Sequence, residues 1–321
     1  MNRSQARAGA EPTASFMTLT GWGRRASRLR GFLLVAVTVT VFYLLFRRID
    51  LRQTLLALGR MSGGVWILAA LLTVSFPVMS ATRWHLILRS SGHAVPLRRC
   101  LLIILGIWPL TAISPSKIGD LLKAVSLRRD LDMALVVGSV LTERVLDVLV
   151  LAVFALVGGV ALGESSLVAI AALVVSAVCI LLVLSRFHAA LPIGERLQTK
   201  LRTVLSSLRA LHHRPVAFAL ILLLTGANWF ASIVQTALLF GGVGAAVPFG
   251  FTTAALPIAI FAGLLPITFA GMGTRDLALV TLFAPFASSS QALAVGLLYS
   301  FFGHWLLAVL GLPFVRRALT L

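Results

Sequence analysis

The sequence predicts an all-α polytopic membrane protein with about six full spans and two broken or re-entrant segments. Of its 321 residues, 59% are hydrophobic and only 12% are charged, which excludes an ordinary soluble domain. Apolar runs recur from Phe32 to Phe314, each close to the ~20 residues that a helix needs to cross a bilayer. None alternates as a membrane β-strand would, so the spans are expected to be helices.

The distribution of basic residues predicts the orientation in the membrane. The net charge of +18 is concentrated between the apolar runs, which is typical of basic cytoplasmic loops and argues against a nucleic-acid partner. Residues 186–214 contain six Lys and Arg residues and one acidic residue. Residues 158–166 and 241–248 contain no Lys or Arg. We therefore expect 186–214 and both termini to be cytoplasmic, in a bacterial-type cytoplasmic (inner) membrane.

The N-terminal third is expected to hold a basic cytoplasmic tail (1–30) and the first two spans of one integral membrane domain (31–315). These spans are Phe32–Phe46 and Val65–Ala81. Between them lies a basic stretch that this topology would place outside, against the basic-inside pattern. A short interfacial helix over Leu51–Leu58 would account for it. The basic residues concerned are Arg47, Arg48, Arg52 and Arg60.

The later spans follow in the second half of the chain. Within the cytoplasmic block, residues 191–212 carry apolar side chains at helical spacing with basic residues opposite. This pattern predicts an amphipathic helix, either lying on anionic inner-leaflet lipids or packed on the protein as a solvated connector. The C-terminal residues 316–321 form a second basic tail. The spans are Ala134–Leu162, Leu167–Ser185, Val216–Gly241 and Gln291–Val315.

Two apolar segments contain too much proline to be plain spans. Leu101–Ser116 holds Pro109 and Pro115 and has basic residues on both flanks, so it is expected to enter from the cytoplasmic side and return. Phe249–Ala287 contains three prolines, and the residues that flank it are uncharged. It either enters from outside and returns or makes two short spans, which would give eight in total. Such breaks persist only beside protein or a wet cavity.

The two broken segments share a weak sequence echo. Residues 113–122 (ISPSKIGDLL) and 267–279 (ITFAGMGTRDLAL) both run from Ile-Ser/Thr through Gly to Asp-Leu. If the segments enter from opposite sides, they form an inverted repeat whose broken helices meet near mid-membrane, where many transporters bind substrate. Chance similarity between apolar sequences is the alternative.

Glu143, Arg144 and Asp147 are the only charges between Asp132 and Glu164. At 100° per residue, the three lie on one face of a helix, and ionised groups there should face protein or water. They either form an ion pair that locks helix packing or line a polar cavity.

Arg275 and Asp276 follow Gly271 and Gly273 at the centre of the second broken segment. Glycines permit a tight turn, and an arginine can bind the phosphate of a lipid headgroup through two nitrogens. A mutual Arg–Asp pair in a connecting loop is the alternative. We expect these charges and those of residues 143–147 to converge on one hydrated pocket.

The first broken segment repeats this chemistry with Lys117, Asp120 and Lys123, where lysines that extend to the cytoplasmic interface are the favoured interpretation. For Arg83, followed by Trp84, an interfacial anchor is the default explanation, and a place in the cavity wall is the alternative. The residues expected to bind substrate or line the cavity are Arg83, Lys117, Asp120, Glu143, Arg144, Asp147, Arg275 and Asp276. The cysteines and histidines show no ligand spacing, so neither a metal nor another cofactor is expected. The predicted backbone breaks are Pro115, Gly119, Pro266, Gly271 and Gly273.

Four motifs resemble a known family. RWHLILRSSG (83–92), SPSKIGDLLK (114–123), LTERVLDVLVL (141–151) and LPITFAGMGTRDLALV (265–280) occur in the order and at about the spacing of the lysylphosphatidylglycerol synthase transmembrane-region, or flippase-like, family. Asp120 and Asp276 stand where Glu would be equally expected. The positions that match family motifs are Arg83, Pro115, Gly119, Asp120, Glu143, Arg144, Asp147, Gly271, Gly273, Arg275 and Asp276.

The resemblance implies a flippase-like translocase that moves a phospholipid or isoprenoid lipid with a polar headgroup between leaflets. In the namesake proteins this region carries aminoacylated lipid, and a cytosolic aminoacyl-transferase domain follows it. This sequence ends at Leu321, so we expect no transferase activity from it. The alternative is a membrane enzyme or accessory subunit acting on a lipid headgroup or polyprenyl-linked glycan. The lipid, the direction, the energy source and the oligomeric state stay open.

Overall fold

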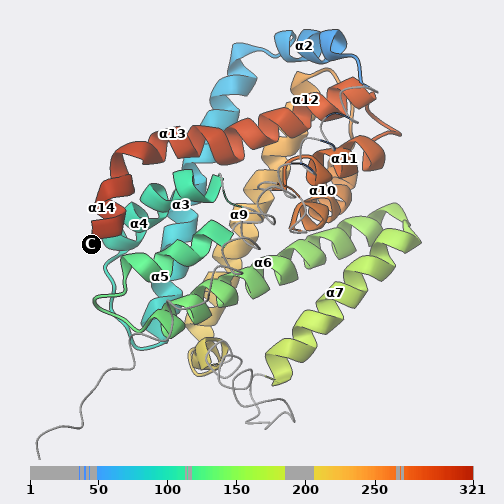
Figure 1. Cartoon of the computed structure of the whole chain (residues 1–321). Helices are drawn as coiled ribbons and strands as arrows, with labels where there is room; N and C mark the ends of the chain where they lie inside the picture. Colours follow the sequence, from blue (N-terminus) through green and yellow to red (C-terminus); the bar gives the residue numbers. More distant parts are fainter. Residues whose placement is uncertain are drawn as a thin grey trace, which may run out of the picture.

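The computed structural model describes residues 49–112, 114, 118–184, 206–264, 268 and 271–320, with the single positions 36, 40 and 43. Within these residues all regular structure is helical, which confirms the predicted all-α polytopic membrane protein (Figure 1). The tail 1–30, most of the predicted span Phe32–Phe46 and most of the predicted amphipathic helix 191–212 lie outside them. Four helical stretches there are long and apolar enough to cross a membrane: Gly63–Ser90, Met133–Leu162, Pro215–Gly242 and Ser289–Thr320.

Helices α3 (Gly63–Ser90) and α9 (Pro215–Gly242) pack against each other in opposite directions, and each has 28 residues. Gly242 lies against Met61 and Val65 at one end of the pair, which we call the α2 end. Ile87 packs with Leu211 and Ile221 at the other end, which we call the α14 end. These two ends are the reference for the rest of the molecule.

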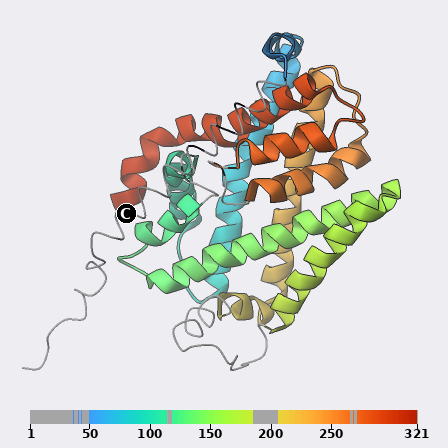
Figure 2. The ribbon, with the colours of Figure 1, turned by 45° about the vertical axis from the view of Figure 1, so that its right-hand side comes forward.

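Two further long segments run across this pair (Figure 2). Helix α6 (Met133–Leu162) starts at the α14 end, and the last segment starts at the α2 end, where the Ser290 hydroxyl donates to the Asp50 carbonyl over 3.4 Å. That segment bends through successive helical pieces, one of them a π-helix. The pieces are α12 (Ser289–Ser300), the π-helix η2 (Phe301–Leu306), α13 (Leu307–Gly311), the 3₁₀ turn η3 (Leu312–Phe314) and α14 (Val315–Thr320).

Two further helices, α7 and α2, lie outside the two broken segments. Helix α7 (Ser165–Leu184) returns along α6 after a turn in which Gly163 adopts a left-handed conformation with φ of 70°. Helix α2 (Leu51–Gly59) begins at Asp50, whose carboxylate accepts from two backbone amides of the first turn. The predicted helix over Leu51–Leu58 is thereby confirmed, and it lies across the end of the bundle (Figure 1).

The first broken segment forms a hairpin at the α14 end. Helix α4 (Leu97–Ala112) runs inward, and the 3₁₀ turn η1 (Ile118–Leu121) and α5 (Leu122–Ser126) lead back out. Arg99 pairs with Asp130 over 2.5 Å near the two ends of this hairpin, so the chain enters and leaves on the same side. At 16 residues, α4 is about 24 Å long, too short for a ~30 Å hydrocarbon core. The first broken segment therefore returns to the end of the bundle from which it started, as the predicted re-entrant path requires.

The second broken segment forms a hairpin at the α2 end. Helix α10 (Phe249–Leu264) packs against α11 (Thr274–Leu282). The residue after α11, Phe283, stacks on Phe240 at the end of α9, with ring centroids 4.5 Å apart. The segment therefore returns to the end of the bundle from which it started, which favours the re-entrant one of the two predicted paths.

Helix order and length repeat between the two halves. Each half begins with a helix of 28 residues, which a helix of 16 residues follows. A short helix then completes the hairpin, and a long segment comes after it. The first set runs α3, α4, α5, α6 and the second runs α9, α10, α11, α12, with opposite directions through the bundle. In Figures 1 and 2 the hairpins occupy opposite ends of the space between α6 and the α12–α13 segment. This arrangement favours the inverted repeat over chance similarity.

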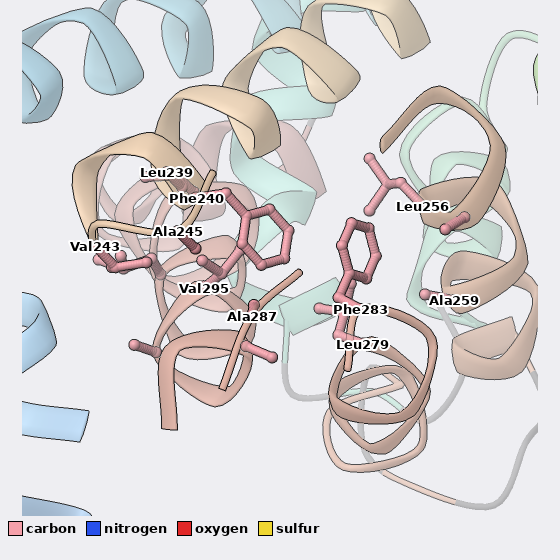
Figure 3. Close-up of a cluster of buried hydrophobic side chains, with 14 of the residues drawn as sticks. Leu239, Phe240, Val243, Ala245, Leu256, Ala259, Leu279, Phe283, Ala287 and Val295 are labelled. Atoms are coloured by element: carbon pink, nitrogen blue, oxygen red, sulfur yellow. The ribbon is translucent and has the colours of Figure 1, made fainter. Parts of the chain in front are cut away.

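The largest hydrophobic cluster secures the second hairpin (Figure 3). Phe240 of α9 and Phe283 face each other across its centre, while Leu256 and Ala259 approach from α10 and Val295 from α12. A second cluster joins α3, α4, α5 and α6 around Trp84, which is fully buried. Each hairpin is thus held by a separate apolar core.

The predicted boundary of the second span is wrong. Helix α3 continues past Ala81 to Ser90, and the side chains of Arg83 and Trp84 are buried. Their interpretation as an interfacial anchor is therefore also wrong. Hydropathy marked the end of the span at the first charge, but that charge is satisfied inside the protein by partners distant in the sequence.

Candidate functional site

Asp147 is the centre of the site. Its side chain accepts hydrogen bonds from Arg83 over 2.6 Å, from Arg144 over 2.8 Å and from the indole of Trp229 over 2.9 Å. These donors come from α3, α6 and α9, so one carboxylate joins three spans. Asp147 itself is 4% exposed, and such a burial of a carboxylate requires this degree of pairing.

Glu143 lies one turn away on the same face of α6, as predicted. Its two oxygens accept from Arg83 over 3.0 Å and from Lys123 over 2.6 Å. The ammonium of Lys123 also lies 5.1 Å from the ring centroid of Trp84. The expectation that Lys123 extends to the cytoplasmic interface is therefore wrong: Lys123 is buried and reaches inward from α5.

Arg144 points to the first hairpin. Its guanidinium donates to Asp147 on its own helix and to Asp120 of η1, the latter over 2.6 Å. Six charged residues thus form one connected set, which we call the charge network. It contains three cations and three acids: Arg83, Lys123 and Arg144 with Asp120, Glu143 and Asp147.

The charge network borders a cavity of about 120 Å³ at the centre of the bundle, which we call the central cavity. This volume has room for several water molecules and includes polar walls that can hold them. Glu143 does not line the central cavity, while the other five members do. The opposite walls are formed by aromatic and polar residues of α3, α4, α9 and the last segment: Phe76, Trp108, Asn228, Trp229, Ser232, Gln235, Tyr299 and His304.

One wall of the central cavity is formed by irregular backbone. The π-helix at Phe301–Leu306 brings Gly303 and His304 to the cavity, and the indole of Trp108 on α4 donates to the Gly303 carbonyl over 3.2 Å. A π-helical turn frees backbone groups for such external partners and often occurs at functional sites. The first hairpin and the last segment are thereby joined beside the cavity.

Arg275 and Asp276 form a separate buried pair, and neither lines the central cavity. Arg275 donates to the Asp276 carboxylate over 2.6 Å and to the Ser300 hydroxyl over 2.6 Å. The guanidinium carbon lies 4.6 Å from the ring centroid of Tyr299, whose hydroxyl reaches Ser232 at the cavity over 3.2 Å. The Arg275–Asp276 pair and the charge network therefore do not share one pocket, contrary to the prediction. Tyr299 contacts Arg275 and also lines the central cavity.

The predicted glycine breaks mark close backbone contacts. A Cβ on Gly119 would lie 2.6 Å from the Thr111 Cα within the first hairpin, and one on Gly271 would lie 2.4 Å from the Gly263 carbonyl oxygen within the second. Gly271 and Gly273 also have φ of 72° and 99°, which favour glycine. Pro115, Lys117 and Pro266 lie outside the described residues.

Several cavity residues were not predicted from the sequence. Asn228, Trp229 and Gln235 are polar groups in the otherwise apolar span α9, and this signal could have identified them. The Gln235 amide donates to the Ala69 carbonyl over 2.7 Å, which ties α9 to α3. His304 gives the same signal in the last span, whereas Tyr299 and Gly303 do not. Among the described residues, no group of three His, Cys, Asp or Glu side chains is arranged to hold a metal ion.

The comparisons with known proteins agree with this architecture. No curated protein matches the chain. A family model described as the lysylphosphatidylglycerol synthase TM region matches residues 31–311 and therefore covers both hairpins, the charge network and the central cavity. The chain belongs to the lysylphosphatidylglycerol synthase transmembrane-region family, a family of membrane proteins linked to lipid modification or translocation.

Proposed function

We propose that the protein moves a lipid with a polar headgroup, or a lipid-linked intermediate, between the leaflets of the membrane. The observation that carries the proposal is the charge network beside a cavity that the first hairpin lines, with the second hairpin reaching the cavity wall through the contact of Arg275 with Tyr299. Ionised residues inside membrane-spanning segments are costly and are characteristic of substrate pathways.

The chemistry of the central cavity suits a headgroup and not an acyl chain. Arginine and lysine bind phosphate, carboxylates and indole faces bind amines, and hydroxyl and amide groups bind sugar or glycerol hydroxyls. The cavity presents all of these within about 120 Å³. Under this proposal the tails stay in the bilayer along the apolar outer faces of α3, α6 and α9, while the headgroup passes the charge network.

Alternating access would use the two hairpins. Broken helices entering from opposite sides can open one path while the other stays closed, as in transporters built from inverted repeats. The first hairpin contributes Asp120 and Lys123 to the network, and Arg275 of the second hairpin lies against Tyr299 of α12, which lines the cavity. A modest shift of either hairpin would therefore change the cavity walls.

The orientation follows the basic residues. We propose that the α14 end faces the cytoplasm, with both termini on that side, because most described arginines lie there. They also suit contact with anionic inner-leaflet lipids. The α2 end carries Arg52 and Arg60. At the α14 end the arginines outside the charge network are Arg89, Arg98, Arg99, Arg128, Arg129, Arg209, Arg214, Arg316 and Arg317.

The test is lipid movement by the purified full chain in proteoliposomes. Phosphatidylglycerol with a fluorescent acyl chain is incorporated, and a membrane-impermeant reductant reports how fast inner-leaflet probe reaches the outside. The wild type should accelerate this exchange, and Asp147→Asn should slow it by about tenfold or more. Asp130→Asn, the same chemical change in an exposed ion pair, should not.

The assay has a clear contrary result. If protein-containing and empty vesicles exchange phosphatidylglycerol, phosphatidylethanolamine and a polyprenyl phosphate at equal rates, the proposed function is wrong. Equal rates for Asp147→Asn and wild type would instead remove the charge network from the transport path.

A further inference from the structure

The ion pair between Arg144 and Asp120 is the least enclosed part of the charge network. The side chains of Arg144 and Asp120 are 32% and 16% exposed. Those of Arg83, Lys123, Glu143 and Asp147 are between 1% and 6% exposed. This pair is therefore the part of the charge network that is most accessible to a ligand in the central cavity.

The guanidinium of Arg144 is incompletely used. Nη1 donates to Asp147, and Nη2 donates to Asp120 over 2.6 Å. Nε is buried and has no hydrogen-bond acceptor within the described part of the chain. Nε–H and one Nη2–H point in the same direction along one edge of the planar group. This edge can bind two oxygens of one phosphate, yet here it holds a single carboxylate oxygen.

Asp120 and the other two acids of the network differ in how they are held. Glu143 and Asp147 project from the interior of the 30-residue helix α6. Asp120 lies on the four-residue turn η1, next to the tip of the first hairpin, where Gly119 packs on Thr111. A shift of η1 can withdraw Asp120 from Arg144 while α6 keeps its structure and Asp147 keeps its bond to Arg144.

We propose that Asp120 is an internal substitute for the substrate's phosphate on Arg144. In the absence of ligand, the Asp120 carboxylate accepts the hydrogen bond from Nη2 of Arg144. A phosphate or phosphodiester group then displaces Asp120 and binds Nε and Nη2 together, while Nη1 stays on Asp147. One negative charge replaces another on Arg144, so its pairing is preserved, and the release of Asp120 frees the first hairpin to move. This inference rests on the proposed function, since it assigns the headgroup chemistry of the same site.

The test is a binding titration of the full-length protein in maltoside micelles, read by native mass spectrometry. The probes are dioleoylphosphatidylglycerol, dioleoylglycerol without phosphate, and soluble glycerol 1-phosphate. Asp120→Asn should bind phosphatidylglycerol about tenfold tighter, as expected if Asp120 occupies Arg144 about nine-tenths of the time. Arg144→Lys keeps the charge but loses the two-nitrogen edge, and should bind about tenfold weaker. Asp130→Asn is the matched control and should bind as the wild type does.

The direction of the change separates this inference from a structural role. A purely structural Asp120 gives weaker or unchanged binding in Asp120→Asn, and either result overturns the proposal, as does wild-type binding by Arg144→Lys. Asp120→Ser is the second variant. If neither Asp120 variant yields folded, monodisperse protein, Asp120 is a structural partner and the proposal is wrong.

The probes and the transport assay distinguish the remaining cases. Dioleoylglycerol binding with the same dependence on Asp120 and Arg144 would overturn the phosphate assignment. Binding of glycerol 1-phosphate with that dependence supports a free phosphate ester as the source, and its absence supports the lipid headgroup. Unchanged binding in Asp120→Asn with normal transport rejects only this inference, whereas the expected binding shifts without transport reject only the proposed function.

Discussion

At the level of single residues, the molecule concentrates its polar chemistry on a few side chains with several partners each. Asp147 accepts three hydrogen bonds and Glu143 accepts two, all from cationic or indole donors. Removing one member of a buried ion pair leaves a charge that neither water nor protein compensates. The network is therefore expected to be intolerant of single deletions.

Asp147→Ala should strongly destabilise the protein. The substitution leaves Arg83 and Arg144 facing each other without their shared acceptor, at a cost of about 3–5 kcal/mol. Thermal unfolding in detergent, followed by tryptophan fluorescence, measures the effect. Asp130→Ala, which removes an exposed partner of Arg99, should cost about 1 kcal/mol or less. Equal melting temperatures for both variants would contradict this role of Asp147.

How far the sequence predicts these residues depends on sequence separation. The common face of Glu143, Arg144 and Asp147 is a property of one helix, so local geometry predicts it. The partners Arg83 and Lys123 lie far away in the sequence and on other elements. Hydropathy places such charges at span ends by default, and only the packed structure shows that acids inside the bundle neutralise them.

At the level of elements, glycines set how closely the hairpins and spans approach. A Cβ on Gly158 of α6 would lie 2.7 Å from the Ala254 nitrogen of α10. A Cβ on Gly311 would lie 2.2 Å from the Leu105 carbonyl oxygen of α4. Real Cβ atoms do not tolerate such distances from backbone. Small residues that allow close helix approach are a principal means of association in membranes.

Gly158→Ala should therefore destabilise the protein, and Gly226→Ala should not. Both residues lie inside long apolar helices, but nothing lies within 4 Å of a Cβ built on Gly226. Gly158→Ala should destabilise by about 1–3 kcal/mol through overpacking against α10. Gly226→Ala should be neutral or stabilise by up to about 1 kcal/mol through helix propensity. Melting temperatures of the two variants, compared with the wild type, check both signs.

Elements were predicted well where the signal was local and less well where it was not. Proline content and flanking charge indicated two broken segments, and both fold as hairpins. Pro109 and Pro257, however, lie inside helices α4 and α10 and do not end them, because helices packed in a membrane protein tolerate the lost backbone bond. The π-helix over Phe301–Leu306 has no recognised sequence signal and was missed.

At the level of the whole molecule, the two hairpins lie at opposite ends of the bundle, and each starts and ends at its own end. The stretch 243–248 before the second hairpin and the stretch 283–288 after it both lie at the α2 end. The turns before and after the first hairpin lie at the α14 end. The opposed ends agree with the basic-residue asymmetry, which the sequence showed without any structure.

Cysteine labelling can verify this topology in cells. In a background with Cys100 and Cys179 replaced by Ser, single cysteines at Ala246 and Ser288 should react with a membrane-impermeant maleimide added to intact spheroplasts. Cysteines at Ala94 and Arg128 should react only after permeabilisation. All four positions are exposed. Reaction of Ala246→Cys and Ser288→Cys from different sides would mean that the second segment crosses the membrane.

The equality of cations and acids in the charge network has an electrical consequence. Transferring one elementary charge across a membrane costs about 2.3 kcal/mol for every 100 mV. Three arginine or lysine groups matched by three carboxylates have no net charge. If these residues shift together, the transmembrane voltage does almost no work on them. Any voltage dependence of transport would then report the ionic state of the cargo and not a movement of the protein's own charge.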